Sequence, residues 1–318
     1  MNADEGKQNL TPAKPSRWRR RLIFGLAGAV FLLAAAALAL DHWLPYMLLS
    51  HYKFSVDPHP KILDEHGATT EPIEFITQDG VPIRGWFIPA PPARDGRPAI
   101  TMIVLHTLGR TRQDMLEFTL PFRRDGFNLA LIDLRGHGES GGELFTYGAH
   151  EWRDVQGLLD WLARRPDGAG ERVAVLGASS GGAVAIAAAV RDRRIRAVAT
   201  IDSFADLRTV AAHQASWLPG FWLRRALAKA EHLADFRIED ASPERLACEL
   251  RCPLLVAHGT ADSYVPFEEG QRLYAAAGSP RKEFYEIQGA GHATMFALGG
   301  DALRARIVSL VREAMAEK

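Results

Sequence analysis

The chain has 318 residues, 47% of them hydrophobic, and its 38 basic residues are balanced by 38 acidic ones. That length and hydrophobic content are enough for one large domain, or two small ones, with a buried core. The balanced charge, with no stripe dense in Lys and Arg beyond the N-terminal region, argues against nucleic acid as a partner.

The N-terminal region combines positive charge with a long apolar run. Residues 1–16 are polar and predict a disordered tail, residues 17–21 read RWRRR, and the nineteen residues 22–40 carry no charge. A helix of that length rises about 1.5 Å per residue and spans most of a ~30 Å hydrocarbon core. We therefore expect a basic cytoplasmic tail over residues 1–21 and a transmembrane helix over residues 22–40.

The charges around this run predict its orientation. Positive charge stands before it and little follows, so the N-terminus is expected in the cytoplasm and the globular part outside. The Ala- and Arg-rich composition favours a bacterial inner membrane. Two alternatives stay open. Residues 37–39 read ALA and resemble a signal-peptide cleavage site, which would give a secreted protein. The other alternative, a buried core helix, is disfavoured by the four arginines beside the run.

The rest of the chain alternates strands with helices. Residues 41–67 predict a juxtamembrane linker that lies along the membrane surface, and a globular domain is expected over residues 68–318. Strands are predicted at 71–77, 81–89, 100–106, 127–133, 172–177, 197–201, 253–257 and 283–287, and helices at 113–124, 151–164, 183–189, 267–277 and 302–314. This order predicts an α/β fold with a mostly parallel, doubly wound sheet covered by helices on both faces. Residues 203–242 interrupt the alternation and are expected to form a small helical cap.

A tight turn with a serine at its apex follows the strand at residues 172–177. Residues 177–182 read GASSGG, so Gly177 and Gly181 flank Ser179 at the positions where a strand and the following helix approach each other closely. The N-terminus of that helix favours negative charge at the same point. A second frame centres the turn on Ser180, but glycine suits both flanks of Ser179 better.

A serine hydroxyl becomes a strong nucleophile only beside a base, and the base works best when an acid orients it. Asp262 follows the strand at 253–257, and His292 follows the strand at 283–287. Loops at one edge of a parallel sheet can bring an acid and a base to the serine in the order Ser179, Asp262, His292. Asp202, which also ends a strand, is the alternative acid.

Four motifs together carry a family resemblance. They are GASSGG at 177–182, DLRGHGES at 133–140, HGTAD at 258–262 with Val265 and Pro266 after it, and GAGH at 289–292. With them, residues 71–314 resemble the α/β-hydrolase superfamily, in particular its esterase and serine-aminopeptidase-like branch. The resemblance implies that Ser179 attacks an acyl carbon, His292 transfers the proton and Asp262 orients His292.

The resemblance also implies an oxyanion hole. One backbone N–H comes from Ser180 and the other from the loop after the strand at 100–106. Where relatives often read His-Gly in that loop, this chain reads HTLG at 106–109, so the second donor is Leu108 or Thr107, and we favour Leu108. Backbone donors survive a change of side chain, so the departure concerns the shape of the loop.

Other polar residues suggest plainer roles. Asp133, Arg135 and His137 are expected to hold the turn at 133–140, and His106 and His258 to be structural histidines beside the site. No cluster has metal-ligand spacing, no glycine-rich turn has the lysine of a phosphate loop, and no cofactor is implied. The cysteines, Cys248 and Cys252, exclude a disulfide scaffold and lack the second pair that a zinc site needs. They predict two free thiols, with a local bridge as the alternative.

These observations favour a membrane-anchored serine hydrolase that cleaves carboxylic esters through an acyl-enzyme. Its partner is expected to be an apolar, small-molecule acyl substrate. Trp217, Phe221 and Trp222 in the cap are the candidate pocket residues, with packing of the cap as their alternative role. Two other functions stay open: a peptidase or amidase with the same three residues, and a non-catalytic binding protein on the same fold.

Overall fold

A computed structural model of the chain describes residues 17–91 and 99–316. The predicted tail at residues 1–16 lies outside this range. The chain divides into two compact units between Leu44 and Pro45. The sequence predicted that the globular domain starts near residue 68. The larger unit starts at Pro45 and therefore also includes residues 45–67 of the predicted linker.

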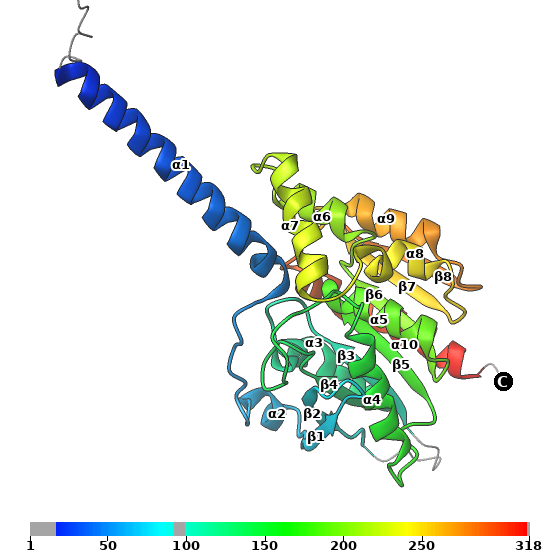
Figure 1. Ribbon diagram of the computed structural model, residues 1–318. Helices are drawn as coiled ribbons and strands as arrows, with labels where there is room; N and C mark the ends of the chain where they lie inside the picture. The colour runs from blue at the N-terminus through cyan, green and yellow to red at the C-terminus, as the bar shows by residue number, and fades with distance from the viewer. Residues whose placement is uncertain (1–16, 92–98, 317–318) are drawn as a thin grey trace, which may run out of the picture. The chain divides into compact units, whose positions relative to one another are not determined.

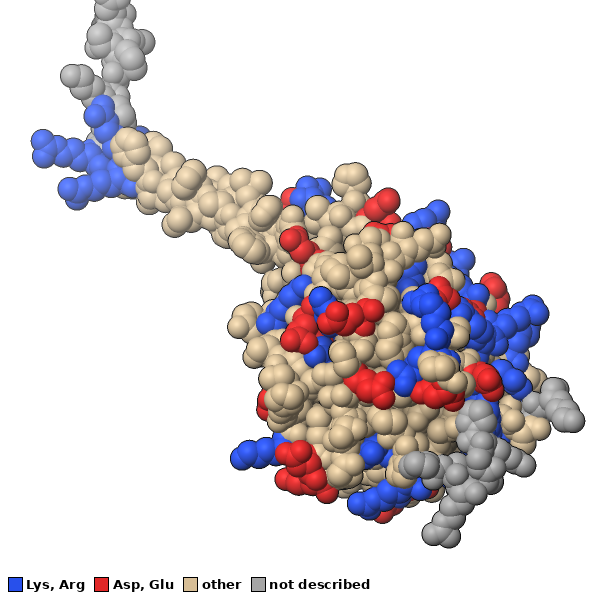
Figure 2. Space-filling model, turned by 90° about the horizontal axis from the view of Figure 1, so that it is seen from below, with Lys and Arg blue, Asp and Glu red and all other residues tan. Residues whose placement is uncertain are grey.

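The smaller unit consists of most of helix α1 (Arg17–Leu49). Among the described helices, α1 is the one with the length and apolar composition needed to cross a membrane. Figure 2 shows Lys and Arg side chains gathered at one end of this helix, followed by an uncharged stretch. A membrane anchor and a signal sequence both have this pattern.

The larger unit is built on an eight-stranded sheet with the order β1-β2-β4-β3-β5-β6-β7-β8 (Figure 1). The strands are β1 (Glu71–Ile76), β2 (Pro82–Ile88), β3 (Ile100–Leu105), β4 (Phe127–Ile132), β5 (Val173–Ala178), β6 (Ile195–Ile201), β7 (Leu254–Gly259) and β8 (Lys282–Ile287). Only the pairs formed by β2, with β1 and with β4, are antiparallel among the described strands. Every residue of β3, β4, β5 and β7 is buried, as expected for strands that are covered on both faces. The predicted α/β sheet is confirmed.

Helices cover both faces of this sheet. Helices α4 (Trp152–Ala163), α5 (Ser180–Arg191), α8 (Pro243–Ala247) and α9 (Phe267–Ala276) contribute to one apolar core, and α3 (Leu116–Thr119) and α10 (Met295–Ala316) contribute to the other. Helices α8 and α2 (Lys61–Glu65) have five residues each, and the sequence did not predict α2.

Two predicted helices have different boundaries in the structure. Residues 113–124 form 3-10 turns at Arg112–Met115 and Leu120–Asp125 on either side of α3, because a capping box starts a separate turn and Pro121 lacks the N–H that a continuous helix needs. Helix α10 begins at Met295, before the predicted start at residue 302, and is kinked at Gly300, where φ is 43°.

The cap region contains α6 (Leu207–Gln214) and α7 (Gly220–Leu233). Leu207, Val210 and Ala211 of α6 are buried against the body. Ala226, Leu227 and Ala230 of α7 are buried as well, so both helices of the cap pack on the body.

The end of α1 and the residues after it pack on the body of the larger unit. Leu49 is 1% exposed, and its carbonyl accepts a 2.7 Å hydrogen bond from the N–H of Phe145. The hydroxyl of Tyr147 donates a 2.7 Å bond to the carbonyl of Leu48, and Lys53 donates one of 2.7 Å to the carbonyl of Ser140. This segment, residues 45–56, is called the docked segment below. Its residues belong to the linker that the sequence predicted at residues 41–67.

Candidate active site

The turn around Ser179 has the geometry of a nucleophile elbow. Ser179 adopts φ 51° and ψ −117°, which is strained for a residue with a side chain, and its N–H donates a 2.7 Å bond to the carbonyl of Ile201. A Cβ added to Gly177 would lie 2.2 Å from the carbonyl oxygen of Gly181, and one added to Gly181 would lie 2.6 Å from the carbonyl oxygen of Leu105. Only glycine at both flanks lets β5, α5 and β3 approach this closely.

The predicted acid and base form a direct pair. His292 Nδ1 lies 2.7 Å from Asp262 Oδ2, while the N–H groups of Tyr264 and Val265 donate to Asp262 Oδ1 at 2.8 and 2.9 Å. Burial alone would raise the pKa of Asp262, but the hydrogen bond and charge of His292 outweigh it and hold that pKa below its usual range. Asp262 is therefore ionised at neutral pH. As a carboxylate it accepts a hydrogen bond from the Nδ1–H of His292, and in that tautomer Nε2 carries a free lone pair.

The two loops that carry this pair are joined to each other. The N–H of Ala261 donates a 2.9 Å bond to the carbonyl of Ala290, and the N–H of Gly289 donates one of 2.9 Å to the hydroxyl of Thr260. A Cβ on Gly259 would lie 2.3 Å from the Ala290 oxygen, so close contact between the loops depends on that glycine.

Parallel pairing brings all three predicted residues to one edge of the sheet. Ser179, Asp262 and His292 follow β5, β7 and β8, whose C-terminal ends point the same way. Within the described residues, no hydrogen bond joins the Ser179 hydroxyl to His292. Such bonds are often long in unliganded enzymes and shorten when substrate binds.

Two histidines fix the loop that was predicted to supply an oxyanion donor. His106 Nδ1 donates to the carbonyl of Thr107 at 2.8 Å, and its Nε2 accepts the N–H of Leu134 at 3.0 Å. His137 Nε2 accepts the N–H of Gly109 at 3.1 Å, and burial together with the neighbouring His106 lowers the pKa of His137 to about 3. Both rings are therefore neutral structural groups around Leu108.

The turn at 133–140 is held by buried ion pairs. Asp133 accepts bonds from the side chain and the N–H of Arg112 and from the N–H of Glu139. Arg135 binds the buried carboxylate of Asp154 at 2.7 Å and Asp79 at 2.6 Å. The ion pairs hold the turn at 133–140 in place, and His137 of this turn contacts the loop at 106–109 through Gly109.

A small apolar pocket lies beside Ser179. Its volume is about 40 Å³, and both predicted oxyanion residues, Ser180 and Leu108, line it. The other lining residues are Leu48, Tyr147, Ser179, Phe204, Leu207, Val210, Ala211, Gln214 and Val265. The sequence analysis missed Leu48 and Tyr147. The one signal for Leu48 was the apolar run around it, which predicted contact with a membrane surface.

The aromatic residues of the cap are placed elsewhere, which corrects the expectation that they line the pocket. Trp217 is 70% exposed and Phe221 is 55% exposed, and neither they nor Trp222 line the cavity beside Ser179. Trp217 lies in the connection between α6 and α7, and the other two lie in the first turn of α7, whereas the cap residues that line the cavity with Ser179 include Leu207, Val210, Ala211 and Gln214 of α6. Sequence alone gives the side chains of a cap but not which of its helices faces inward.

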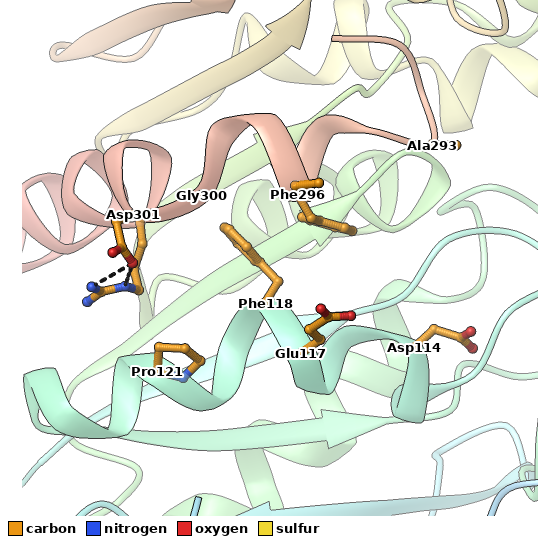
Figure 3. A pocket seen from close by; sticks show the side chains of 10 residues that line it. Asp114, Glu117, Phe118, Pro121, Ala293, Phe296, Gly300 and Asp301 are labelled. Atoms are coloured by element: carbon orange, nitrogen blue, oxygen red, sulfur yellow. Dashed lines mark hydrogen bonds and ion pairs between the residues drawn. The ribbon is translucent and has the colours of Figure 1, made fainter. Parts of the chain in front are cut away.

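A larger hollow of about 340 Å³ begins next to the loop that carries His292 (Figure 3). Ala293 lines it, as do Phe118 and Phe296, whose rings contact each other with their centroids 4.7 Å apart. Its charged residues are Asp114, Glu117, Asp301 and Arg304, of which Arg304 is paired with Asp301 and Asp125. The hollow is therefore predominantly acidic.

Asp202 adds a second carboxyl group to the site. It is 2% exposed, its Oδ1 accepts the N–H of Gly259 at 3.0 Å, and its Oδ2 is buried without a partner, 4.0 Å from His292 Nδ1. Burial, helped by the charge of Asp262, raises the pKa of Asp202 to about 7. Asp262 and not Asp202 holds the close bond to His292, which favours Asp262 as the orienting acid.

Among the described residues, Asp202, Asp262 and His292 are the one group with ligand atoms near enough to share a metal ion, all within 4.8 Å of one another. Asp262 and His292 are already hydrogen-bonded to each other, so an ion would have to displace that bond. The two thiols, Cys248 and Cys252, are free, and Cys248 is exposed.

Comparison with known proteins places the chain among hydrolases. Residues 115–301 match the prolyl oligopeptidase family, Peptidase_S9. The YfhR protein of Salmonella typhi is 28% identical over 81% of this chain and 84% of its own length. A protein of Mycobacterium tuberculosis is 32% identical over 68% of this chain and 70% of its own length.

Solved structures share the fold at lower identity. An esterase of Pyrococcus furiosus is 22% identical, with a TM-score of 0.67 over 85% of this chain and 98% of its own. Acetyl xylan esterase 1 of a Thermoanaerobacterium species is 18% identical, with a TM-score of 0.59 over 86% of this chain and 93% of its own. These similarities confirm the α/β-hydrolase fold that the four motifs predicted.

Proposed function

The chain belongs to the prolyl oligopeptidase family of α/β hydrolases, and on this premise we propose that it hydrolyses carboxylic esters with Ser179, His292 and Asp262 as catalytic residues. His292 Nε2 takes the proton of the Ser179 hydroxyl as Oγ bonds to the acyl carbon. The ester C–O bond then breaks, and the alcohol leaves with that proton. Water then attacks the acyl carbon while His292 takes its proton. The bond between the acyl carbon and Ser179 Oγ breaks, His292 returns the proton to Oγ, and the carboxylic acid leaves.

One observation carries this proposal. Asp262 and His292 are hydrogen-bonded at 2.7 Å, at the same sheet edge where Ser179 occupies a strained, glycine-flanked turn. The N–H groups of Ser180 and Leu108, beside Ser179, are the proposed oxyanion donors. Each such donor is worth about 3 kcal/mol of transition-state stabilisation. A non-catalytic binding protein would have no need for a histidine hydrogen-bonded to a buried carboxylate beside this turn.

The pocket and the hollow support an ester as the substrate. The cavity beside Ser179 is apolar and small, which suits an acyl group, and we propose that the leaving group extends toward the hollow lined by Ala293, the residue after His292. Because the hollow is predominantly acidic, we expect a neutral or cationic leaving group.

A peptidase or amidase is the second candidate. The family description favours it, as does the 26% identity to an uncharacterized peptidase, YuxL of Bacillus subtilis, which this chain matches over 35% of that protein's length. The same three residues would serve, with an amine as the leaving group. Turnover of p-nitrophenyl acetate compared with aminoacyl p-nitroanilides separates the two, and a preference for the amide would overturn the ester proposal.

Labelling with a fluorophosphonate probe tests the nucleophile. We expect Ser179→Ala to abolish labelling, and Ser179→Ala and His292→Ala each to lower kcat at least ~10³-fold, with the double variant little worse because the residues act as a unit. Ser180→Ala keeps its backbone N–H and is the matched control for the alternative frame. If Ser180→Ala loses labelling while Ser179→Ala retains it, the assignment of the nucleophile is wrong.

We also propose that α1 anchors the enzyme in a membrane, with the catalytic domain outside the cytoplasm. The support is the length of its apolar run and the arginines that precede it. The alternative is a signal sequence that is removed.

A further inference from the structure

The wall of the pocket beside Ser179 is not formed by the catalytic loops and the cap alone. Leu48, in the last turn of α1, lines the cavity together with residues of α6 and of the loop at 144–148. It comes from the docked segment, residues 45–56, which belongs to the same compact unit as Ser179. More than a hundred positions separate Leu48 from Ser179 in the sequence.

Several contacts hold Leu48 in place. Its carbonyl accepts a 2.7 Å bond from Tyr147, whose ring also lines the pocket, and the carbonyl of the next residue, Leu49, accepts a 2.7 Å bond from Phe145. Leu49 is 1% exposed and is part of the same apolar core as Tyr147 and Phe145. Leu48 is therefore held in position by its hydrogen bond to the buried Tyr147 and by the buried Leu49 that follows it.

The space that this wall leaves is small. One water-sized group needs a cavity of about 10–15 Å³. The cavity beside Ser179 has about 40 Å³, so it accepts an acyl group of about two or three carbon atoms. Drug-sized ligands occupy pockets of ~300 Å³ or more. Leu207, Val210 and Ala211 of α6 also line the cavity and are themselves buried. The side chains that bound this small space, Leu48 among them, leave no room in it for a longer acyl chain.

We propose that Leu48 determines the acyl-chain length this enzyme accepts, and that the site takes esters of short carboxylic acids such as acetate. The inference rests on the proposed ester hydrolysis and adds the substrate class and the residue that sets it. Truncating Leu48 to alanine opens the pocket toward the docked segment and admits longer chains without touching the catalytic groups.

The test compares p-nitrophenyl acetate with p-nitrophenyl hexanoate, using the full chain in detergent. We expect wild type to prefer acetate and Leu48→Ala to raise the hexanoate-to-acetate ratio of kcat/KM about tenfold or more, since each methylene in an apolar pocket is worth about 10-fold or more. Met47→Ala is the matched control, because Met47 is the adjacent residue and is 67% exposed. Leu48→Val is a milder second variant in which the ratio should rise less.

Titration of active sites with the fluorophosphonate probe counts the folded enzyme in each preparation, so loss of folded protein does not mimic a change of preference. A wild type that cleaves neither ester would refute the proposed function itself. A wild type that cleaves acetate, with a Leu48→Ala ratio within about twofold of the Met47→Ala ratio, would refute only the role of Leu48. Wild-type preference for hexanoate would refute the proposed specificity for short acids and leave the proposed ester hydrolysis standing.

Discussion

The carboxyl group of Asp202 is buried next to the acid–base pair without taking part in it. Its Oδ2 has no partner, Asp262 and His292 face it, and His258 Nε2 lies 3.9 Å from its Oδ1. Burial keeps a proton on this group, with a pKa of about 7 against the ordinary 3.8. Asp202 is therefore largely neutral below neutral pH, which spares the site a second negative charge beside Asp262.

This proton predicts how stability depends on pH. Between about pH 4 and pH 7 the folded protein holds a proton that the unfolded chain has lost, so the contribution of Asp202 is fully present below pH 4 and declines as pH rises through about 7. Asp202→Asn keeps an acceptor for Gly259 and has no proton to lose. We expect the unfolding free energy of wild type minus that of the variant to fall by on the order of 2–4 kcal/mol from pH 4 to pH 8.

Urea unfolding of both proteins at several pH values measures this difference. Titrations of groups far from residue 202, which the two proteins share, cancel in the subtraction, whereas Asp262 and His292 are coupled to Asp202 and belong to the measured difference. A difference that does not change with pH would show that Asp202 is ionised in the folded state.

At the scale of single residues, the sequence predicted the site residues that stand in local motifs. Asp262 and His292 stand in short, recognisable loops, and the structure joins them by a hydrogen bond. The pKa of Asp202 and the position of Leu48 depend on what packs around them from distant parts of the chain. No local pattern contains that information.

At the scale of elements, the close approach of α5 to β3 depends on glycine. Gly181 is the second residue of α5, and a Cβ there would meet backbone oxygens of Leu105 and His106 at 2.6 Å. Backbone atoms cannot rotate away as a side chain does, so helix and strand would have to separate. That separation would also move the loop at 106–109, which carries Leu108.

We expect Gly181→Ala to lower the free energy of unfolding by about 1–3 kcal/mol, as overpacking does, and to reduce turnover. Gly220→Ala is the matched control at the start of another helix. Its Cβ would meet only the end of the Arg224 side chain, at 3.5 Å, so we expect no loss of stability. Thermal or urea unfolding with the ester assay checks both. Equal stability of the two variants would contradict the packing argument.

Strands were predicted more accurately than helices. A strand buried on both faces is a continuous apolar run, and this signal located β3, β4, β5 and β7. The segment at 113–124 has helical spacing of apolar residues, but its capping box and Pro121 divide it into 3-10 and α turns. The cap residues at 217–222 were assigned to the pocket from their chemistry, while the packing of α6 decides which side chains face Ser179.

At the scale of the whole molecule, the exposed cysteine gives a test of membrane topology. Cys248 is exposed, whereas burial raises the pKa of Cys252 to about 11 and keeps that thiol unreactive at neutral pH. We expect a membrane-impermeant maleimide to label Cys248 in intact spheroplasts, because the arginines before the apolar run of α1 favour an N-terminus in the cytoplasm.

The Cys248→Ser variant is the control for labelling at other sites. Labelling that requires permeabilised membranes would place the domain in the cytoplasm and overturn the proposed orientation. Fractionation of the same cells distinguishes an anchored chain, which sediments with membranes, from a processed one, which does not.

Leu48 lies nine residues beyond the ALA sequence at 37–39. A leader peptidase acting there would leave the docked segment attached, so the anchored and the released enzyme would share one acyl preference. A protease cutting within residues 50–67 would instead sever the segment from the catalytic body. Maturation of the first kind would change only where the enzyme works, whereas a cut of the second kind would also change which esters it consumes.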